Sequence, residues 1–260
     1  MAASNFTTAQ TAVPAPMKPL FTWRDGVLAG GFAIATFAIR PLDKSAATDL
    51  QTPGYQKNRY LQKSATIVRN IALPGSFIIG PTLYAAGRLS HDRQLAELGL
   101  HGTEALFVGA GIGNVLKDLF GRARPFVDTT GPNPNDFQLL RGFHAGDDYR
   151  SFPSGHTVAA FAAAAAVSAE TSRWYPRGIY FIGPLMYGGA AAVGVSRMYN
   201  NRHWASDVIL GAAIGTFAGI KVVRYQHTHS GNRLDRWLLN ASISPQDPGH
   251  ISLSVIPQIR

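Results

Sequence analysis

Six apolar stretches separated by polar segments dominate the pattern along the chain of 260 residues. They cover roughly residues 26–40, 66–87, 95–118, 155–170, 178–196 and 207–223. Each stretch is too long for a typical strand and long enough for a helix. The pattern therefore predicts an all-α protein, a bundle of about six helices.

Two of these stretches have the length of a membrane span, because no charged residue lies between Arg69 and Arg88 or between Arg177 and Arg197. The other four are shorter or contain polar residues such as His101 and Glu104, which would have to face the interior of a bundle. The pattern fits either a soluble bundle of Ala-rich helices or a membrane protein with six short spans. Span length favours the integral membrane protein.

The amino-acid composition narrows the classes of function that fit this chain. Charged residues make up 15% of the chain and the net charge is +9, a surplus that suits nucleic acid, anionic lipid or a phosphate-bearing substrate. The basic residues are scattered rather than in one block, so we expect no nucleic-acid binding. The absence of cysteine excludes disulfides, thiolate nucleophiles and cysteine-zinc sites.

The polar segments suggest how the chain is organised. Residues 1–22 are polar, lack the features of a signal peptide and predict a disordered segment. Residues 23–226 form the expected domain, and the loop 125–152 inside it is long enough to be functional. In the tail, residues 227–260, the alternating stretch "HISLSVIPQI" predicts one short strand.

Candidate chemistry begins at "KDLFGRARP", where Lys117 and Arg124 are seven residues apart. On a helix this spacing is two turns, so both cations would share one face, and Pro125 would end the helix. The alternative is an ordinary charge cluster that terminates a membrane span.

A second group lies in "SRMYNNRHWASD". His203 and Asp207 are one helical turn apart, so the carboxylate can accept the imidazole N–H and make the other ring nitrogen a better nucleophile. Arg197 can offer a bidentate fork to a phosphate. The alternative is a plain helix start with an acidic residue near the positive end of its dipole.

The third group is "PSGH", directly before an Ala-rich stretch. Ser154 can cap the following helix, Gly155 allows close approach of a ligand, and the free N–H groups of a helix start bind anions. His156 would stand at the same mouth as a proton donor. A capped helix with a spare histidine is the alternative.

The order of crossings predicts that the three groups meet at one end of the bundle, if each helix between them crosses it completely. Together they suit phosphoryl transfer: Lys117, Arg124 and Arg197 supply positive charge, His203 attacks phosphorus, and His156 protonates the leaving oxygen and later activates water. No acidic cluster with divalent-metal spacing accompanies them, so we expect no metal and no cofactor.

The three groups resemble the signatures of the type 2 phosphatidic acid phosphatase superfamily: Lys-x6-Arg-Pro, Pro-Ser-Gly-His and Ser-Arg-x5-His-x3-Asp. Here they stand intact and in order, from Lys117 to Asp207, within residues 95–223. The resemblance implies a compact helical core like that of the phosphatases and haloperoxidases. It implies the roles given above, with Ser154 and Gly155 also holding the phosphate.

The resemblance leaves several functions open. The short chain and its apolar helices favour a membrane phosphatase acting at the extracytoplasmic surface of a bacterial cytoplasmic membrane. Its substrates would be of the class of undecaprenyl diphosphate, phosphatidylglycerol phosphate or phosphatidic acid. A soluble acid phosphatase, a vanadium-dependent haloperoxidase and a non-catalytic lipid- or phosphate-binding membrane protein are the alternatives. The sequence indicates no oligomeric state.

Overall fold

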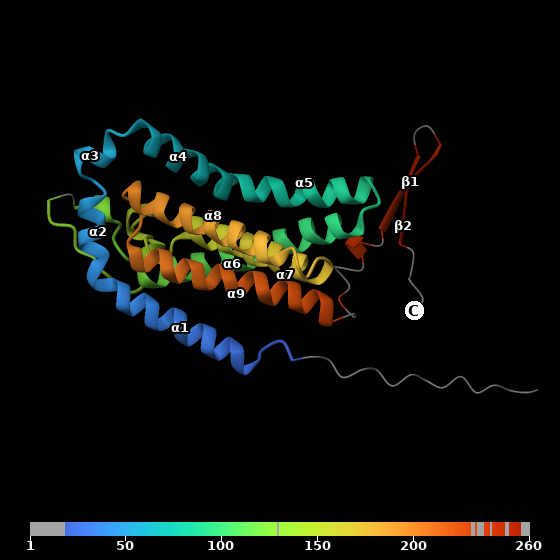
Figure 1. Ribbon diagram of the computed structural model, residues 1–260, viewed down its shortest axis with the longest axis horizontal. Helices are drawn as coiled ribbons and strands as arrows, with labels where there is room; N and C mark the ends of the chain where they lie inside the picture. The colour runs from blue at the N-terminus through green and yellow to red at the C-terminus, as the bar shows by residue number, and fades with distance from the viewer. Residues whose placement is uncertain are drawn as a thin grey trace, which may run out of the picture.

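The computed structural model describes residues 19–128, 130–229, 232, 237–239, 241–247 and 250–255. Within them, helical stretches run side by side along one axis (Figure 1): α1 (Trp23–Ile39), α4 (Arg59–Asn70) continued by α5 (Ser76–Leu89), α6 (Arg93–Phe120), α7 (Gly155–Trp174), α8 (Ile179–Tyr199) and α9 (Ala205–Thr228). The predicted all-α fold is confirmed, and each expected apolar stretch contributes to one of these helices.

Shorter elements connect the helices: η1 (Arg40–Leu42), α2 (Asp43–Asp49), α3 (Pro53–Gln56), η2 (Ile71–Gly75), η3 (Pro125–Val127), η4 (Arg141–Phe143) and η5 (Asp147–Tyr149). In the tail, β1 (Ala241–Asp247) and β2 (His250–Val255) pair antiparallel, where the sequence predicts a single strand. The predicted disordered segment 1–22 lies outside the described residues except for its last four positions.

The charge-free stretch between Arg69 and Arg88 does not form the single span that the sequence predicts. The π-helical turn η2 separates α4 from α5, and Leu73 within it is extended, with φ −146° and ψ 124°. Pro74 explains the break, because proline removes a helical N–H donor and disfavours helical geometry in the residue before it.

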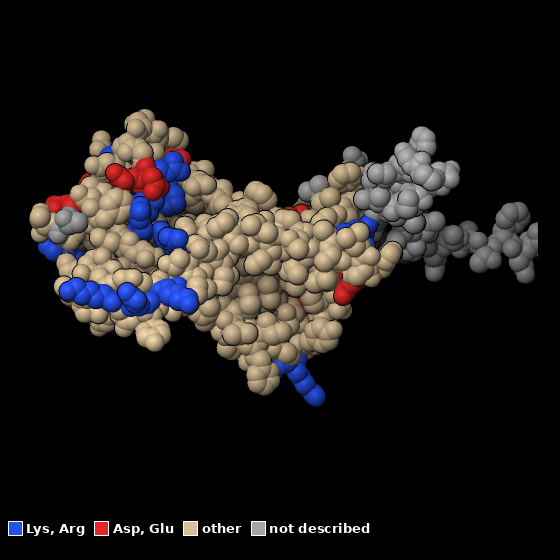
Figure 2. All heavy atoms as spheres, turned by 90° about the horizontal axis from the view of Figure 1, so that it is seen from above, with Lys and Arg blue, Asp and Glu red and all other residues tan. Residues whose placement is uncertain are grey.

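Among the residues that the structure describes, three helical stretches are long and apolar enough to cross a membrane: residues 23–49, 179–199 and 205–228. Large apolar side chains point outward from the bundle, among them Ile34, Phe107 and Phe181, which are 71%, 63% and 80% exposed. Figure 2 shows a dense group of charged side chains at one end and a broad uncharged band beside it. An exposed apolar surface of this kind is typical of a protein integrated in lipid.

Helices α7 and α9 pack closely at the centre because small residues line their interface. A Cβ atom on Gly215 would lie 2.8 Å from the backbone nitrogen of Ala162, and one on Gly219 would lie 2.8 Å from that of Ala166. Buried Ala105, Ala159 and other small side chains of α6, α7 and α9 complete this core. Small residues allow backbones to approach closely where lipid supplies no hydrophobic drive between helices.

Candidate active site

The structure brings the three candidate groups to one end of the bundle, as the crossing order predicts (Figure 1). Lys117 lies near the end of α6, Arg124 in the loop after it, and residues 153–156 at the start of α7. Arg197 lies in the last turn of α8, and His203 and Asp207 flank the start of α9. Helices α1 and α9 both extend from this end of the bundle, where Ile39 and Ala205 lie, to the far end, where Trp23 and Thr228 lie (Figure 1).

The end of α6 differs from the prediction that Pro125 stops the helix. The helix ends at Phe120, and Gly121 follows in the left-handed region with φ 49°. Glycine suits this helix-ending position because it has no Cβ atom to strain the turn. Arg124 is therefore a loop residue rather than a residue two helical turns beyond Lys117.

The Arg124 guanidinium is fixed beside His203. Its Nε and Nη2 donate to the carbonyl and the carboxylate of Asp147, each at 2.7 Å. Its Nη1 donates to the carbonyl of Arg202 at 3.0 Å and lies 3.2 Å from Nε2 of His203. A planar guanidinium with this many acceptors has little freedom to rotate. Burial alone would raise the pKa of Asp147, but Arg124 lowers it below its ordinary value.

The closest acceptor of the His203 ring is not the predicted one. Nδ1 of His203 lies 2.7 Å from the carbonyl oxygen of Ser151 and 3.5 Å from Oδ2 of Asp207. A proton on Nδ1 donated to that carbonyl leaves the lone pair on Nε2. Burial lowers the pKa of His203 well below 6.5, Lys117 and Arg124 lower it further, and Asp207 opposes them. The ring is therefore neutral at neutral pH.

Asp207 is held by groups that the sequence analysis missed. Arg122 donates to Oδ1 of Asp207, the Ser151 hydroxyl donates to Oδ2 at 2.5 Å, and the backbone N–H of Trp204 donates to Oδ2 at 2.9 Å. On its other side Arg122 contacts Asp43 of α2, with Nη2 2.7 Å from Oδ2. Arg122 is a third cation of the segment "KDLFGRARP". Its place between Lys117 and Arg124 is the one sequence feature that could have indicated its role.

The start of α7 is capped differently from the prediction. Ser154 is the N-cap residue, but its side chain makes no cap hydrogen bond and instead accepts from the Thr157 hydroxyl at 2.8 Å. Lys117 reaches the same turn, because its Cε lies 3.5 Å from the position that a Cβ atom would take at Gly155. Its Nζ donates to the carbonyl of Arg150 at 2.7 Å. This turn and Lys117 are thus close enough to bind one anion together.

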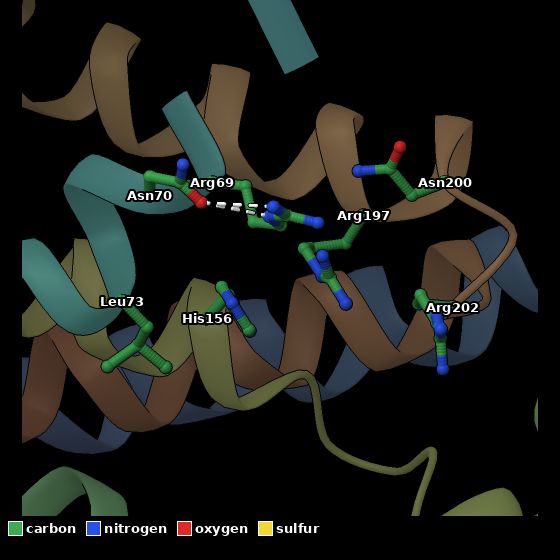
Figure 3. A pocket seen from close by; sticks show the side chains of 7 residues that line it. All are labelled: Arg69, Asn70, Leu73, His156, Arg197, Asn200 and Arg202. Atoms are coloured by element: carbon green, nitrogen blue, oxygen red, sulfur yellow. Dashed lines mark hydrogen bonds between the residues drawn. The ribbon is translucent and has the colours of Figure 1, made fainter. Parts of the chain in front are cut away.

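A cavity of about 440 Å³ opens beside these groups (Figure 3), with His156 and Arg197 in its wall. The lining also contains residues that the sequence analysis did not select: Arg69, Asn70, Leu73, Asn200 and Arg202. Lys117, Arg124 and His203 are buried residues outside this lining. The cavity therefore has three arginines in its wall and further cations close by.

Two donors in this wall have no hydrogen-bond partner among the described residues: Nε of Arg197 and Nδ2 of Asn200, both buried. Buried donors are rarely left unpaired in folded proteins, so these two are available to an acceptor in the cavity, either water or the oxygen atoms of a ligand. Positive charge and unpaired donors in the wall can bind a phosphate. The neutral ring of His203, the residue after Arg202 of the wall, can act as the nucleophile that attacks it.

The sequence profile of the PAP2 superfamily matches residues 100–230 of the chain. Lipid A 1-phosphatase of Porphyromonas gingivalis is 39% identical over 112 residues, which are 42% of this chain and 19% of that protein. The aligned region thus spans about a fifth of the length of this curated relative.

Two solved structures share the fold. A transmembrane PAP2 type phosphatidylglycerolphosphate phosphatase from Bacillus subtilis superposes with a TM-score of 0.59 and 18% identity, covering 82% of this chain and 100% of that one. LpxE of Aquifex aeolicus superposes with a TM-score of 0.50 and 21% identity, covering 71% and 96%. At these identities the likeness establishes the fold alone.

Proposed function

The chain belongs to the PAP2 superfamily, and from this premise we propose that it is a metal-independent membrane phosphatase. Its substrate is a lipid phosphate or diphosphate, and the reaction passes through a phosphohistidine. The observation that carries the proposal is the cavity wall, which contains three arginines, Arg69, Arg197 and Arg202. In this wall Nε of Arg197 and Nδ2 of Asn200 are buried without a hydrogen-bond partner among the described residues. An anionic, oxygen-rich group satisfies both features at once.

In the first step Nε2 of His203 attacks phosphorus, and the bond from phosphorus to the lipid oxygen breaks. Burial and Arg197 lower the pKa of His156 to about 3 in the empty site, and the negative charge of a bound phosphate raises that pKa again, so that His156 takes up a proton with the substrate. His156 gives this proton to the leaving oxygen, so the lipid leaves as a neutral alcohol or as a protonated monophosphate. Lys117, Arg124 and Arg197 stabilise the charge on the equatorial oxygens, together with Ser154 and the N–H groups at Gly155. Ser151 and Asp207 stabilise the positive charge that develops on the His203 ring.

In the second step His156 takes a proton from water, and the resulting nucleophile breaks the phosphorus–nitrogen bond. Inorganic phosphate is released and neutral His203 is restored. The low pKa of His203 in the empty site supports this role, because an unprotonated ring nitrogen is required for the attack.

A lipid substrate fits the surroundings of the cavity. The helices that carry the site expose apolar side chains and include two of the candidate spans. We place the cavity at the extracytoplasmic face of a bacterial cytoplasmic membrane. The candidate substrates are undecaprenyl diphosphate, phosphatidylglycerol phosphate and phosphatidic acid, to which the P. gingivalis relative adds a lipid A 1-phosphate.

Phosphate release from this panel of lipids, in detergent and with a chelator present, tests the proposal. We expect turnover by the unchanged protein and a loss of about 10³-fold or more in His203→Ala, since the nucleophile is gone. His144→Ala, in the exposed loop, is the matched control and should retain turnover. Full activity in His203→Ala would refute the mechanism, and halide oxidation on addition of vanadate without phosphatase activity would refute the function.

A further inference from the structure

A second cluster of ionisable side chains lies at the end of the bundle opposite the cavity. It consists of His101 of α6, Glu170 of α7 and His227 of α9. Nδ1 of His101 is 2.5 Å from Oε1 of Glu170, and Nε2 of His227 is 2.9 Å from each oxygen of that carboxylate. Glu170 and His101 are fully buried, and the side chain of His227 is 15% exposed.

This cluster takes no part in the proposed phosphatase reaction. Lys117 and His101 are separated by about 24 Å along α6, at a rise of 1.5 Å per residue. The cluster adjoins the Ala-rich core of α6, α7 and α9, where an ionisable group is costly to place. Three such groups from three different helices, meeting at one point, indicate a binding function rather than incidental packing.

We propose that His101, Glu170 and His227 bind one divalent transition-metal ion and thereby join α6, α7 and α9. Two imidazole nitrogens and one carboxylate form a donor set that suits zinc and its first-row neighbours, whereas magnesium and calcium prefer oxygen ligands throughout. The ligand atoms all lie within 4.8 Å of one another. Ligands of a tetrahedral zinc ion are about 3.3 Å apart at the usual bond lengths, so the ion requires shifts of under about 1 Å.

The orientation of the two imidazole rings and the partial exposure of His227 support a metal site. The two imidazole rings are perpendicular, with centroids 5.3 Å apart, so their nitrogens approach the carboxylate from different directions. The partial exposure of His227 gives the ion a route from solvent.

Elemental analysis of the full chain tests the proposal, with purification that avoids a polyhistidine tag. After equilibration with zinc and removal of the excess, we expect about one zinc ion per chain. Glu170→Gln and His227→Asn should each lower the zinc content at least tenfold. His229→Asn, two residues beyond His227 and outside the cluster, should retain the ion.

A second measurement, the melting temperature, separates the loss of a metal site from the poor folding of a variant. Chelation should lower the melting temperature of the unchanged protein, and added zinc should restore it, because an ion bound to the folded state stabilises that state. Glu170→Gln should show neither effect, and His203→Ala should keep its zinc while losing phosphatase activity. Equal zinc content in Glu170→Gln and His229→Asn, or no zinc in the unchanged protein, would show that the cluster is only a hydrogen-bonded layer.

Discussion

Replacing Arg122 by methionine tests the buried network at the end of the bundle that carries the candidate active site. Arg122 is fully buried and contacts two carboxylates, those of Asp43 and Asp207. Its Nη1 also donates to the Ser206 hydroxyl at 2.8 Å. The substitution keeps a long flexible side chain but leaves both carboxylates without their cation.

The expected loss of stability is large. Removing one partner of a buried ion pair costs about 3–5 kcal/mol, because the remaining charge is left uncompensated. For a chain of this size 1 kcal/mol corresponds to about 2–4 °C, so the melting temperature should fall by about 6–20 °C. Arg93→Met is the matched control, since Arg93 is exposed and its pair with Glu97, one helical turn away, contributes only about 0.3–0.5 kcal/mol.

Thermal unfolding in detergent measures both variants under identical conditions. Adding Asp43→Asn to Arg122→Met should recover part of the loss, because one uncompensated carboxylate disappears, with a coupling of about 0.5–3 kcal/mol. If Arg122→Met lowered the melting temperature no more than Arg93→Met, the network would not stabilise the end of the bundle that carries the candidate active site.

Three further predictions concern packing, anion binding and pH. Gly215→Ala should lower the stability measured by thermal unfolding by about 1–3 kcal/mol, because the new methyl group meets the backbone of α7. Gly111→Ala, where the space is open, is the control and should be neutral or stabilising. Equal effects of the two substitutions would contradict the close approach of α7 and α9. Arg124→Lys should lower kcat/KM by about 10²-fold, because an ammonium group cannot replace the planar guanidinium beside His203. Steady-state kinetics measures this loss, and a loss of only a few fold would contradict the prediction. Because the pKa of His203 is lowered in the folded protein, the unfolded chain binds one more proton at this residue below pH 6.5. Stability should therefore fall as the pH falls, by up to about 1.4 kcal/mol per pH unit from this group. The melting temperature of His203→Asn should fall less steeply with pH, and an equal slope would contradict the lowered pKa.

The sequence was informative where short-range rules apply. The apolar stretches predicted the helices, and the crossing order predicted that residues far apart in the chain meet at one end. Span length was less reliable, because Pro74 divides a charge-free stretch that counts as one span by composition. The extent of α6 was wrong for a similar local reason, since Gly121 ends the helix before Pro125 does.

The details of the site depend on contacts that no local pattern encodes. Asp43 reaches Arg122 from a helix that precedes the motifs by a long stretch of chain, and the carbonyl of Ser151 replaces Asp207 as the closest acceptor of His203. Arg69 joins the cavity wall only because α4 packs against α8. Such partners follow from the arrangement of the helices, and the sequence could supply only their residue types.

Trapping the phosphoryl group on the enzyme tests the central claim most directly. The protein is mixed with a lipid phosphate, quenched rapidly under alkaline conditions that preserve phosphohistidine, digested and analysed by mass spectrometry. We predict one phosphoryl group on His203, its accumulation in His156→Ala when the leaving group is activated, and its absence in His203→Ala. Turnover of the lipid with no phosphoryl group on His203 in any variant, or with that group on another residue, would contradict the account.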